Sequence, residues 1–164
     1  MRSLSLYSSL GFEVTTPCVV VSGQPRSAPD DAVTVRPVTE DDLEECAALC
    51  ERVHGFARTG ALRDAVHAMA PFAALRDGRI VAYASAVGFW PMAHGAGETD
   101  DDHKALLLGA AATTGEPIAL LVPLRSEVFR WALREGLRAV KPMNIMVRGE
   151  YREPQGAWFP SVLY

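Results

Sequence analysis

The sequence predicts a mixed α+β domain built around one central, mostly antiparallel sheet. Apolar strand-like runs alternate with short amphipathic helical segments, and after residue 31 they follow the order β-α-α-β-β-α-β-α-β. A second observation is an internal repeat, because residues 3–21 align with residues 128–146 without a gap. With 164 residues, 49% of them hydrophobic, the chain can bury one good core.

Each copy of the repeat reads as a short amphipathic helix, a glycine and an apolar strand. Gly11 aligns with Gly136, and Pro17 aligns with Pro142. We expect both glycines to adopt a left-handed conformation just after their helices, since glycine does so without a Cβ penalty. The intervening residues 31–127 are about one domain long. The chain therefore reads as the end of one domain followed by a complete second copy.

We accordingly expect a helix–strand arm (residues 1–22), a linker (23–30) and a domain (31–164). The linker is rich in Ser, Gly and Pro and has no hydrophobic period. The arm strand has no sheet of its own, so its backbone groups and apolar side chains need a partner. We expect the arm to join its own sheet or, as we favour, that of a second molecule, which gives a homodimer by arm exchange.

Caps and turns mark the elements of the domain. Thr39 precedes a helix that ends at His54-Gly55. Asp77-Gly78 between the apolar runs 71–76 and 79–90 predicts a β-hairpin, and residues 91–99 read as a glycine-bearing loop. The remaining expected elements are a strand over 32–36, helices over 61–69, 100–112 and 126–135, strands over 117–124 and 139–148, and a last apolar stretch over 158–164.

Composition excludes several function classes. The formal net charge of −4, without clustered Lys or Arg, argues against nucleic acid as a partner. No apolar run approaches the roughly 20 residues of a membrane helix, and the N-terminus lacks the long apolar block of a signal peptide. Cys18, Cys46 and Cys50 lack the spacing of a metal site. We expect reduced thiols, no bound metal and a cytoplasmic location.

Several motifs together resemble the GCN5-related N-acetyltransferase (GNAT) superfamily. Arg36-Pro37 enters a Thr-Glu-Asp-Asp-Leu helix start, within an element order similar to that of the family. Leu6-Tyr7-x-x-x-Gly11-Phe12 and its strand resemble the family's closing helix, in which the tyrosine often protonates the departing thiolate of coenzyme A. The chain from Arg52 through His94-x-x-Gly97-Glu98-Thr99 to its end resembles the C-terminal half of bacterial tandem GNAT proteins.

The resemblance implies transfer of an acetyl group from acetyl-CoA to a small-molecule amine. The pyrophosphate cradle would lie at the start of the third helix, at Gly95, Gly97 and Thr99, because backbone N–H groups at a helix N-terminus bind phosphate. Tyr7 would be the general acid. His94, expected in a loop that faces the cleft, could join Glu98 in general acid–base work on the amine.

Other residues at these positions favour an alternative function. No arginine or glutamine introduces the cradle, and the acidic residues Glu98 and 100–102 crowd the same turn. At ~4–6 Å each would repel a pyrophosphate by roughly 1–3 kcal/mol. In the second copy, Ala132 stands where Tyr7 stands in the first. The alternative is a non-catalytic GNAT-like lobe that binds a small ligand, supports a partner domain or forms a dimer, with weak or no acetyl-CoA binding.

The other histidines have simpler predicted environments. His54 and His67 lie in or after helices and are expected at the surface or at helix caps. His103 lies in the acidic helix start and is expected to be solvated.

Overall fold

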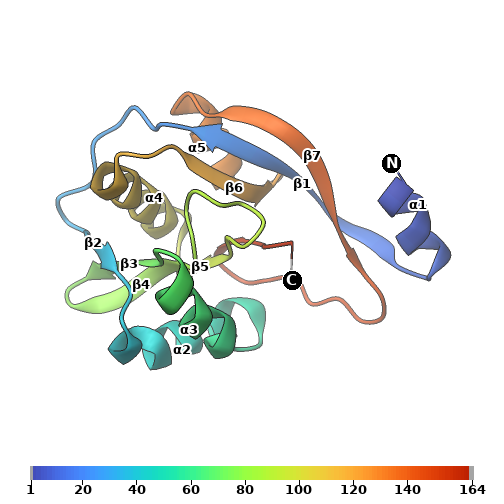
Figure 1. Ribbon diagram of the computed structural model, residues 1–164, viewed down its shortest axis with the longest axis horizontal. Helices are drawn as coiled ribbons and strands as arrows, with labels where there is room; N and C mark the ends of the chain where they lie inside the picture. Colours follow the sequence, from blue (N-terminus) through green and yellow to red (C-terminus); the bar gives the residue numbers. More distant parts are fainter. Residues whose placement is uncertain (1, 163–164) are drawn as a thin grey trace.

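The structure is a computed structural model that describes residues 2–162 (Figure 1). Its helices are α1 (Arg2–Ser9), α2 (Leu43–His54), α3 (Thr59–Ala68), α4 (Asp100–Thr114) and α5 (Glu127–Arg134), with a 3-10 turn (Glu40–Asp42) before α2. Its strands are β1 (Glu13–Gly23), β2 (Thr34–Pro37), β3 (Phe72–Arg76), β4 (Arg79–Ala84), β5 (Gly95–Gly97), β6 (Ile118–Pro123), β7 (Arg138–Val147) and β8 (Ala157–Phe159).

The strands form two antiparallel sheets rather than the single sheet expected. One sheet has the order β6-β1-β7 and the other the order β2-β3-β4-β5-β8. The division falls between β6 and β8, because β8 pairs with β5 and not with β6. The predicted α+β class with antiparallel strands is confirmed.

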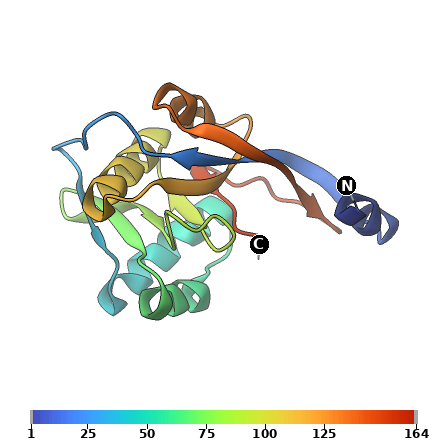
Figure 2. The same cartoon turned by 45° about the horizontal axis from the view of Figure 1, so that its top comes forward.

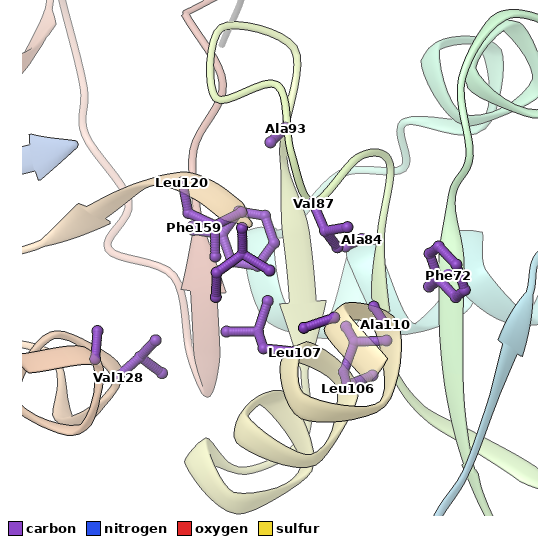
Figure 3. Packing of buried hydrophobic residues seen from close by; sticks show 14 of the residues in the cluster. Phe72, Ala84, Val87, Ala93, Leu106, Leu107, Ala110, Leu120, Val128 and Phe159 are labelled. Carbon is purple, nitrogen blue, oxygen red and sulfur yellow. The ribbon is translucent and has the colours of Figure 1, made fainter. Parts of the chain in front are cut away.

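Helices cover both faces of the five-stranded sheet. Alternate residues of β4 point to opposite sides, so Ala82 and Ala84 join the cluster that contains Leu106 and Leu107 of α4. Tyr83 joins the cluster under α2. Figure 3 shows the α4 side, where Leu107 and Ala110 lie among Phe159, Leu120 and Ala84. No helix within residues 2–162 is long and apolar enough to cross a membrane.

The arm strand lies in the sheet of its own chain. β1 runs between β6 and β7, with Cys18 opposite Pro123 on one side and Met143 on the other. α1 projects from the far end of the β1–β7 ribbon, away from the helices that cover the sheets (Figure 2). The single chain thus adopts the first of the two expected arrangements, whereas arm exchange between two molecules stays a prediction.

The helix-ending glycines are as predicted. Gly11 has a φ of 83° and Gly136 a φ of 89°, both in the left-handed region. Gly55 ends α2 with a φ of 84°. At the other end of this segment, Thr39 and Asp42 form a capping box ahead of α2.

The expected loop over residues 91–99 is wrong in part, because Gly95–Gly97 form strand β5 between β4 and β8. Glycine is required at Gly95, where an added Cβ would lie 2.5 Å from the Phe159 ring and 2.8 Å from the Tyr83 carbonyl oxygen. The glycines that suggested a loop therefore serve close packing instead. The preceding strand is correspondingly shorter than expected and ends at Ala84.

Replacing Gly136 with valine should lower the free energy of unfolding by about 1–2 kcal/mol, since a left-handed backbone is unfavourable for residues with a Cβ. The added Cβ would meet Arg26 Nε at 2.8 Å, a flexible neighbour that can move, so the backbone conformation should dominate the loss. Urea denaturation of the variant measures the difference.

The matched control is Gly60→Val in α3, where the backbone is helical and nothing lies within 4 Å of an added Cβ. It should change stability by no more than about 0.5 kcal/mol. Equal losses in the two variants would show that the left-handed cap at Gly136 contributes nothing specific.

Candidate functional site

The candidate site is the gap between β5 and β6, and the C-terminal strand fills it. β8 pairs antiparallel with β5, with Phe159 opposite Gly95 and Ala157 opposite Gly97. On its other side β8 contacts β6 without forming a ladder. Figure 3 shows the Phe159 side chain beside Leu120 of β6.

Phe159 occupies the centre of this gap. Its ring is fully buried and stacks on the ring of His103 in α4, with centroids 4.9 Å apart and planes inclined by 26°. The same ring covers Gly95, so the space over that glycine is already taken. Full burial of such a side chain stabilises the fold by about 1.5–3 kcal/mol.

The three residues predicted to cradle a pyrophosphate are engaged within the protein. Gly95 and Gly97 are buried strand residues, and a Cβ at Gly97 would lie 3.3 Å from Ala82 and 3.4 Å from His103. The Thr99 hydroxyl accepts a hydrogen bond from the Asp102 backbone N–H at 3.1 Å and lies 2.6 Å from its Oδ2. The start of α4 is therefore capped by its own residues.

Three of the four acidic residues of this turn, Glu98, Asp101 and Asp102, form ion pairs with cations. Glu98 accepts hydrogen bonds from Arg79, one of them at 2.9 Å, and from Arg52 at 3.3 Å. The Arg79 guanidinium lowers the pKa of Glu98 below its ordinary value, so this carboxylate stays charged. Asp102 accepts a hydrogen bond from Arg76 at 3.0 Å. These arginines are held by carboxylates rather than presented toward an anionic ligand.

His94 lies in the core, not in a loop that faces an open cleft. Its ring is 1% exposed, and Nε2 lies 3.1 Å from the hydroxyl of Tyr83 on β4. Burial lowers its pKa to about 3. The physical reason is that residues 85–94 fold back, with His94 N–H donating to the Ser85 hydroxyl at 2.9 Å. His94 and Glu98 thus have different partners, and the structure does not bring them together.

His54 ends α2, as expected, but it lies in the core, and the expected solvation of His103 is wrong. His54 is 2% exposed, with Nε2 3.4 Å from the Gly95 carbonyl oxygen and its ring against Trp158. His103 is fully buried, and neither of its ring nitrogens has a hydrogen-bond partner among the described residues. Burial lowers the pKa of His54 to about 4 and that of His103 to about 3. His67 is exposed as expected, 3.2 Å from Glu40.

Tyr7 lies far from the other predicted site residues. It is 46% exposed on α1, where its ring makes an edge contact with Phe12 at 5.6 Å. Figure 2 shows α1 at the far end of the ribbon from the sheet that contains β5 and β8. The structure therefore does not bring Tyr7 to the gap in which Gly95, Gly97 and Thr99 lie.

The three cysteines are free and buried. Burial raises the pKa of Cys18 and of Cys46 to about 12, so both are protonated thiols at neutral pH. Within residues 2–162, no group of three His, Cys, Asp or Glu side chains could hold a metal ion.

Sequence reasoning missed the polar residues beneath α2. Tyr83 is 1% exposed, and its hydroxyl forms a hydrogen bond with His94. Arg58 Nη1 donates to the Ser161 hydroxyl at 3.4 Å. A tyrosine inside the apolar run of β4 was the available signal, because a buried hydroxyl needs a hydrogen-bond partner.

An open cleft of about 300 Å³ lies at the mouth of the gap. It is lined by β1, by the start of α5 and by the chain that leads into β8. Its charged lining residues are Arg125, Arg130, Asp100, Glu127 and Glu153, and Arg130 donates to Glu127 at 2.6 and 3.0 Å. Because acidic residues outnumber the arginines, the cleft does not present the cationic surface that favours a pyrophosphate.

Comparisons with solved structures show the fold. A protein from Pyrococcus horikoshii assigned as an acetyltransferase superposes with a TM-score of 0.73 over 98% of this chain, at 10% identity and over 55% of its own length. A GCN5-related N-acetyltransferase from Sphaerobacter thermophilus superposes with a TM-score of 0.55 at 17% identity, over 88% of this chain and 55% of its own length. A protein from Novosphingobium aromaticivorans assigned to the GNAT family superposes with a TM-score of 0.54 at 18% identity, over 85% of this chain and 69% of its own length.

The resemblance to the GNAT superfamily is thus supported at the level of the fold. The chain spans only 55% of the length of the Pyrococcus and Sphaerobacter proteins. No known family profile and no curated protein matches the sequence.

The buried, neutral state of His103 predicts acid sensitivity. An unfolded histidine binds a proton below about pH 6.5, whereas the native ring stays neutral until about pH 3. The unfolded state therefore binds more protons in this window, and the free energy of unfolding falls as the pH drops, by up to about 1.4 kcal/mol per pH unit.

His103→Phe should retain the stacked ring, remove two unpartnered nitrogens and make the fall in unfolding free energy between pH 6 and pH 4 shallower by about 1.4 kcal/mol per pH unit. Urea denaturation across this range measures the slope. A slope identical to that of the wild type would mean that His103 is not buried in its neutral form.

Proposed function

We propose that this chain is a GNAT-like lobe that is non-catalytic on its own and supports a partner domain. The observation that carries the proposal is the position of β8, which pairs along β5 and fills the gap toward β6. In the family that this fold resembles, the sheet splays at this place to accept the pantetheine arm of coenzyme A. Here the protein supplies a strand of its own instead.

The residues of the gap do not fit acetyl-CoA. The Phe159 ring covers Gly95, and Thr99 and Asp102 cap the helix start that would receive the pyrophosphate. Glu98 and Asp101 add negative charge at the same turn, although Arg79 and Lys104 pair with them. A bound pyrophosphate would need those cations to leave their carboxylates, which opposes binding.

A second candidate function is acetyl transfer from acetyl-CoA to an amine, with β8 displaced. It is favoured by the fold and by one observation, the buried His103 ring whose nitrogens lack partners beside Phe159. An unsatisfied buried polar group destabilises the fold by about 1–3 kcal/mol, so this packing is not optimal. Loss of β8 would uncover His103 and the edge of β5 together.

Calorimetric titration of the full chain with acetyl-CoA should show no binding stronger than a dissociation constant of about 1 mM. The physical reason is that the ligand must first displace Phe159 from a fully buried position. Tight binding that requires residues 95–99 would contradict the proposed function.

The same titration of Phe159→Ala distinguishes the two candidate functions, provided that far-UV circular dichroism shows a folded protein. Binding by Phe159→Ala alone would favour a transferase closed by β8. The matched control is Phe89→Ala, in which an exposed phenylalanine outside the gap is truncated, and it should behave as the wild type.

A further inference from the structure

We infer that α1 and the outer edge of β7 form a docking surface for a second GNAT-like half, related to this one by a local two-fold axis. The inference rests on the proposed supporting function and names its partner. It is derived from the internal repeat and from the register of the β1–β7 ribbon.

The repeat and the register together define the axis. In the repeat, Gly11 aligns with Gly136, an offset of 125 positions. By this offset the equivalent of Cys18 is Met143, and these two residues are also direct partners in the ladder. Two residues that pair with each other and are also equivalents are related by a two-fold axis that passes between them, perpendicular to the ribbon.

The neighbouring pairs obey the same symmetry. Pro17 pairs with Asn144, and Val19 pairs with Pro142. The repeat equates Pro17 with Pro142 and Val19 with Asn144, so the two-fold operation exchanges these two pairs. The pairing pattern maps onto itself on both sides of Cys18.

The irregularities of the ribbon are symmetric as well. The register shifts once between Val14 and Thr16, which leaves Thr15 unpaired, and once between Val20 and Val21, where Val140 of β7 is unpaired. Thr15 and Val140 are equivalent in the repeat. Since bulges are specific features of strand geometry, their equivalence supports the axis independently of the ladder partners.

The surroundings of the two strands, in contrast, are not symmetric. Residues 18–23 of β1 pair with β6 along the edge that faces away from β7. The equivalent residues of β7 are 143–148, yet β7 is an outer strand whose one neighbour within residues 2–162 is β1. An edge with free hydrogen-bonding groups is a template for a further strand.

The two helices differ in the same way. α5 buries Trp131 and Ala132 against the body of the domain. Their equivalents on α1 are Leu6 and Tyr7, which are 57% and 46% exposed. The apolar side of α1 therefore has no counterpart of the domain surface on which α5 packs.

The two-fold axis predicts which elements cover the outer edge of β7 and the apolar side of α1. It places an equivalent of β6 along the outer edge of β7 and an equivalent of the α5-binding surface under α1. A second copy of this chain does not fit this role, because its own α5 already occupies that surface. The occupant is a GNAT-like half that lacks a closing helix and strand of its own, and α1 and β1 supply them.

The lengths of related folds agree with such a partner. The Pyrococcus horikoshii protein superposes on 98% of this chain and yet has nearly half of its own length outside the match. That remainder is longer than residues 31–127, which form the body between the two repeat copies, so it has room for a body of that size.

The test uses the chain's own body as a stand-in for the second half. Residues 31–127 are fused directly before Ser3 of the full chain, so that α1 takes the position that α5 has in the repeat. We expect a monomer in which amides of residues 143–148 that do not bond to β1 exchange at least tenfold more slowly than in the unfused chain.

Leu6→Asp in the fusion should abolish this protection. In the unfused chain the same change should leave both exchange and melting temperature unaltered, since Leu6 is exposed there. The matched control is Leu133→Asp, an exposed leucine of α5 that should not alter the protection in the fusion. A folded fusion without added protection, or protection that survives Leu6→Asp, would overturn the inference.

Should the added body fail to fold, photo-crosslinking of the full chain in its native cells decides. Crosslinkers at Leu6 and at Asn144 should both capture one polypeptide whose sequence is a GNAT-like half. Capture of a second copy of this chain, of an unrelated protein or of nothing would overturn the inference. Because none of these measurements involves acetyl-CoA, their failure is distinguishable from failure of the proposed function.

Discussion

The pairing of β8 with β5 determines the character of this molecule. The three residues of β8 extend the five-stranded sheet at its edge, and they place Phe159 over Gly95 and against His103. This strand is the edge of the five-stranded sheet, and it fills the space between that sheet and the three-stranded one. Several other features follow from it, including the need for glycine at Gly95 and the desolvation of His54 and His103.

The two sheets serve different purposes. The five-stranded sheet is covered on both faces by α2 and α4, and its candidate site is occupied by the protein itself. The three-stranded sheet carries the local two-fold axis and ends at the outer edge of β7. One sheet is thus complete, while the other and its helix α1 present the apolar surfaces that a partner would cover. This division favours a supporting role over acetyl transfer for the chain by itself.

Sequence patterns predicted features that are set locally. Gly11 and Gly136 follow helices and have positive φ because the cap depends on adjacent residues alone. The environments of His94 and His103 could not be predicted in this way. They depend on Tyr83 and Phe159, which reach them only through the sheet and carry no mark of that contact in the sequence. For the same reason Gly95 and Gly97 suggested an open cradle rather than a packed strand.

The position of Phe159 is the most direct test of the closed gap. Nuclear Overhauser effects report proton pairs within about 5 Å, a distance well beyond the van der Waals contact that joins packed side chains. Ring protons of Phe159 should show them to the Gly95 α-protons and to the His103 ring, both without ligand and with an excess of acetyl-CoA. Absence of these effects in the free protein, or their loss when acetyl-CoA is added, would contradict a gap that the protein's own strand fills.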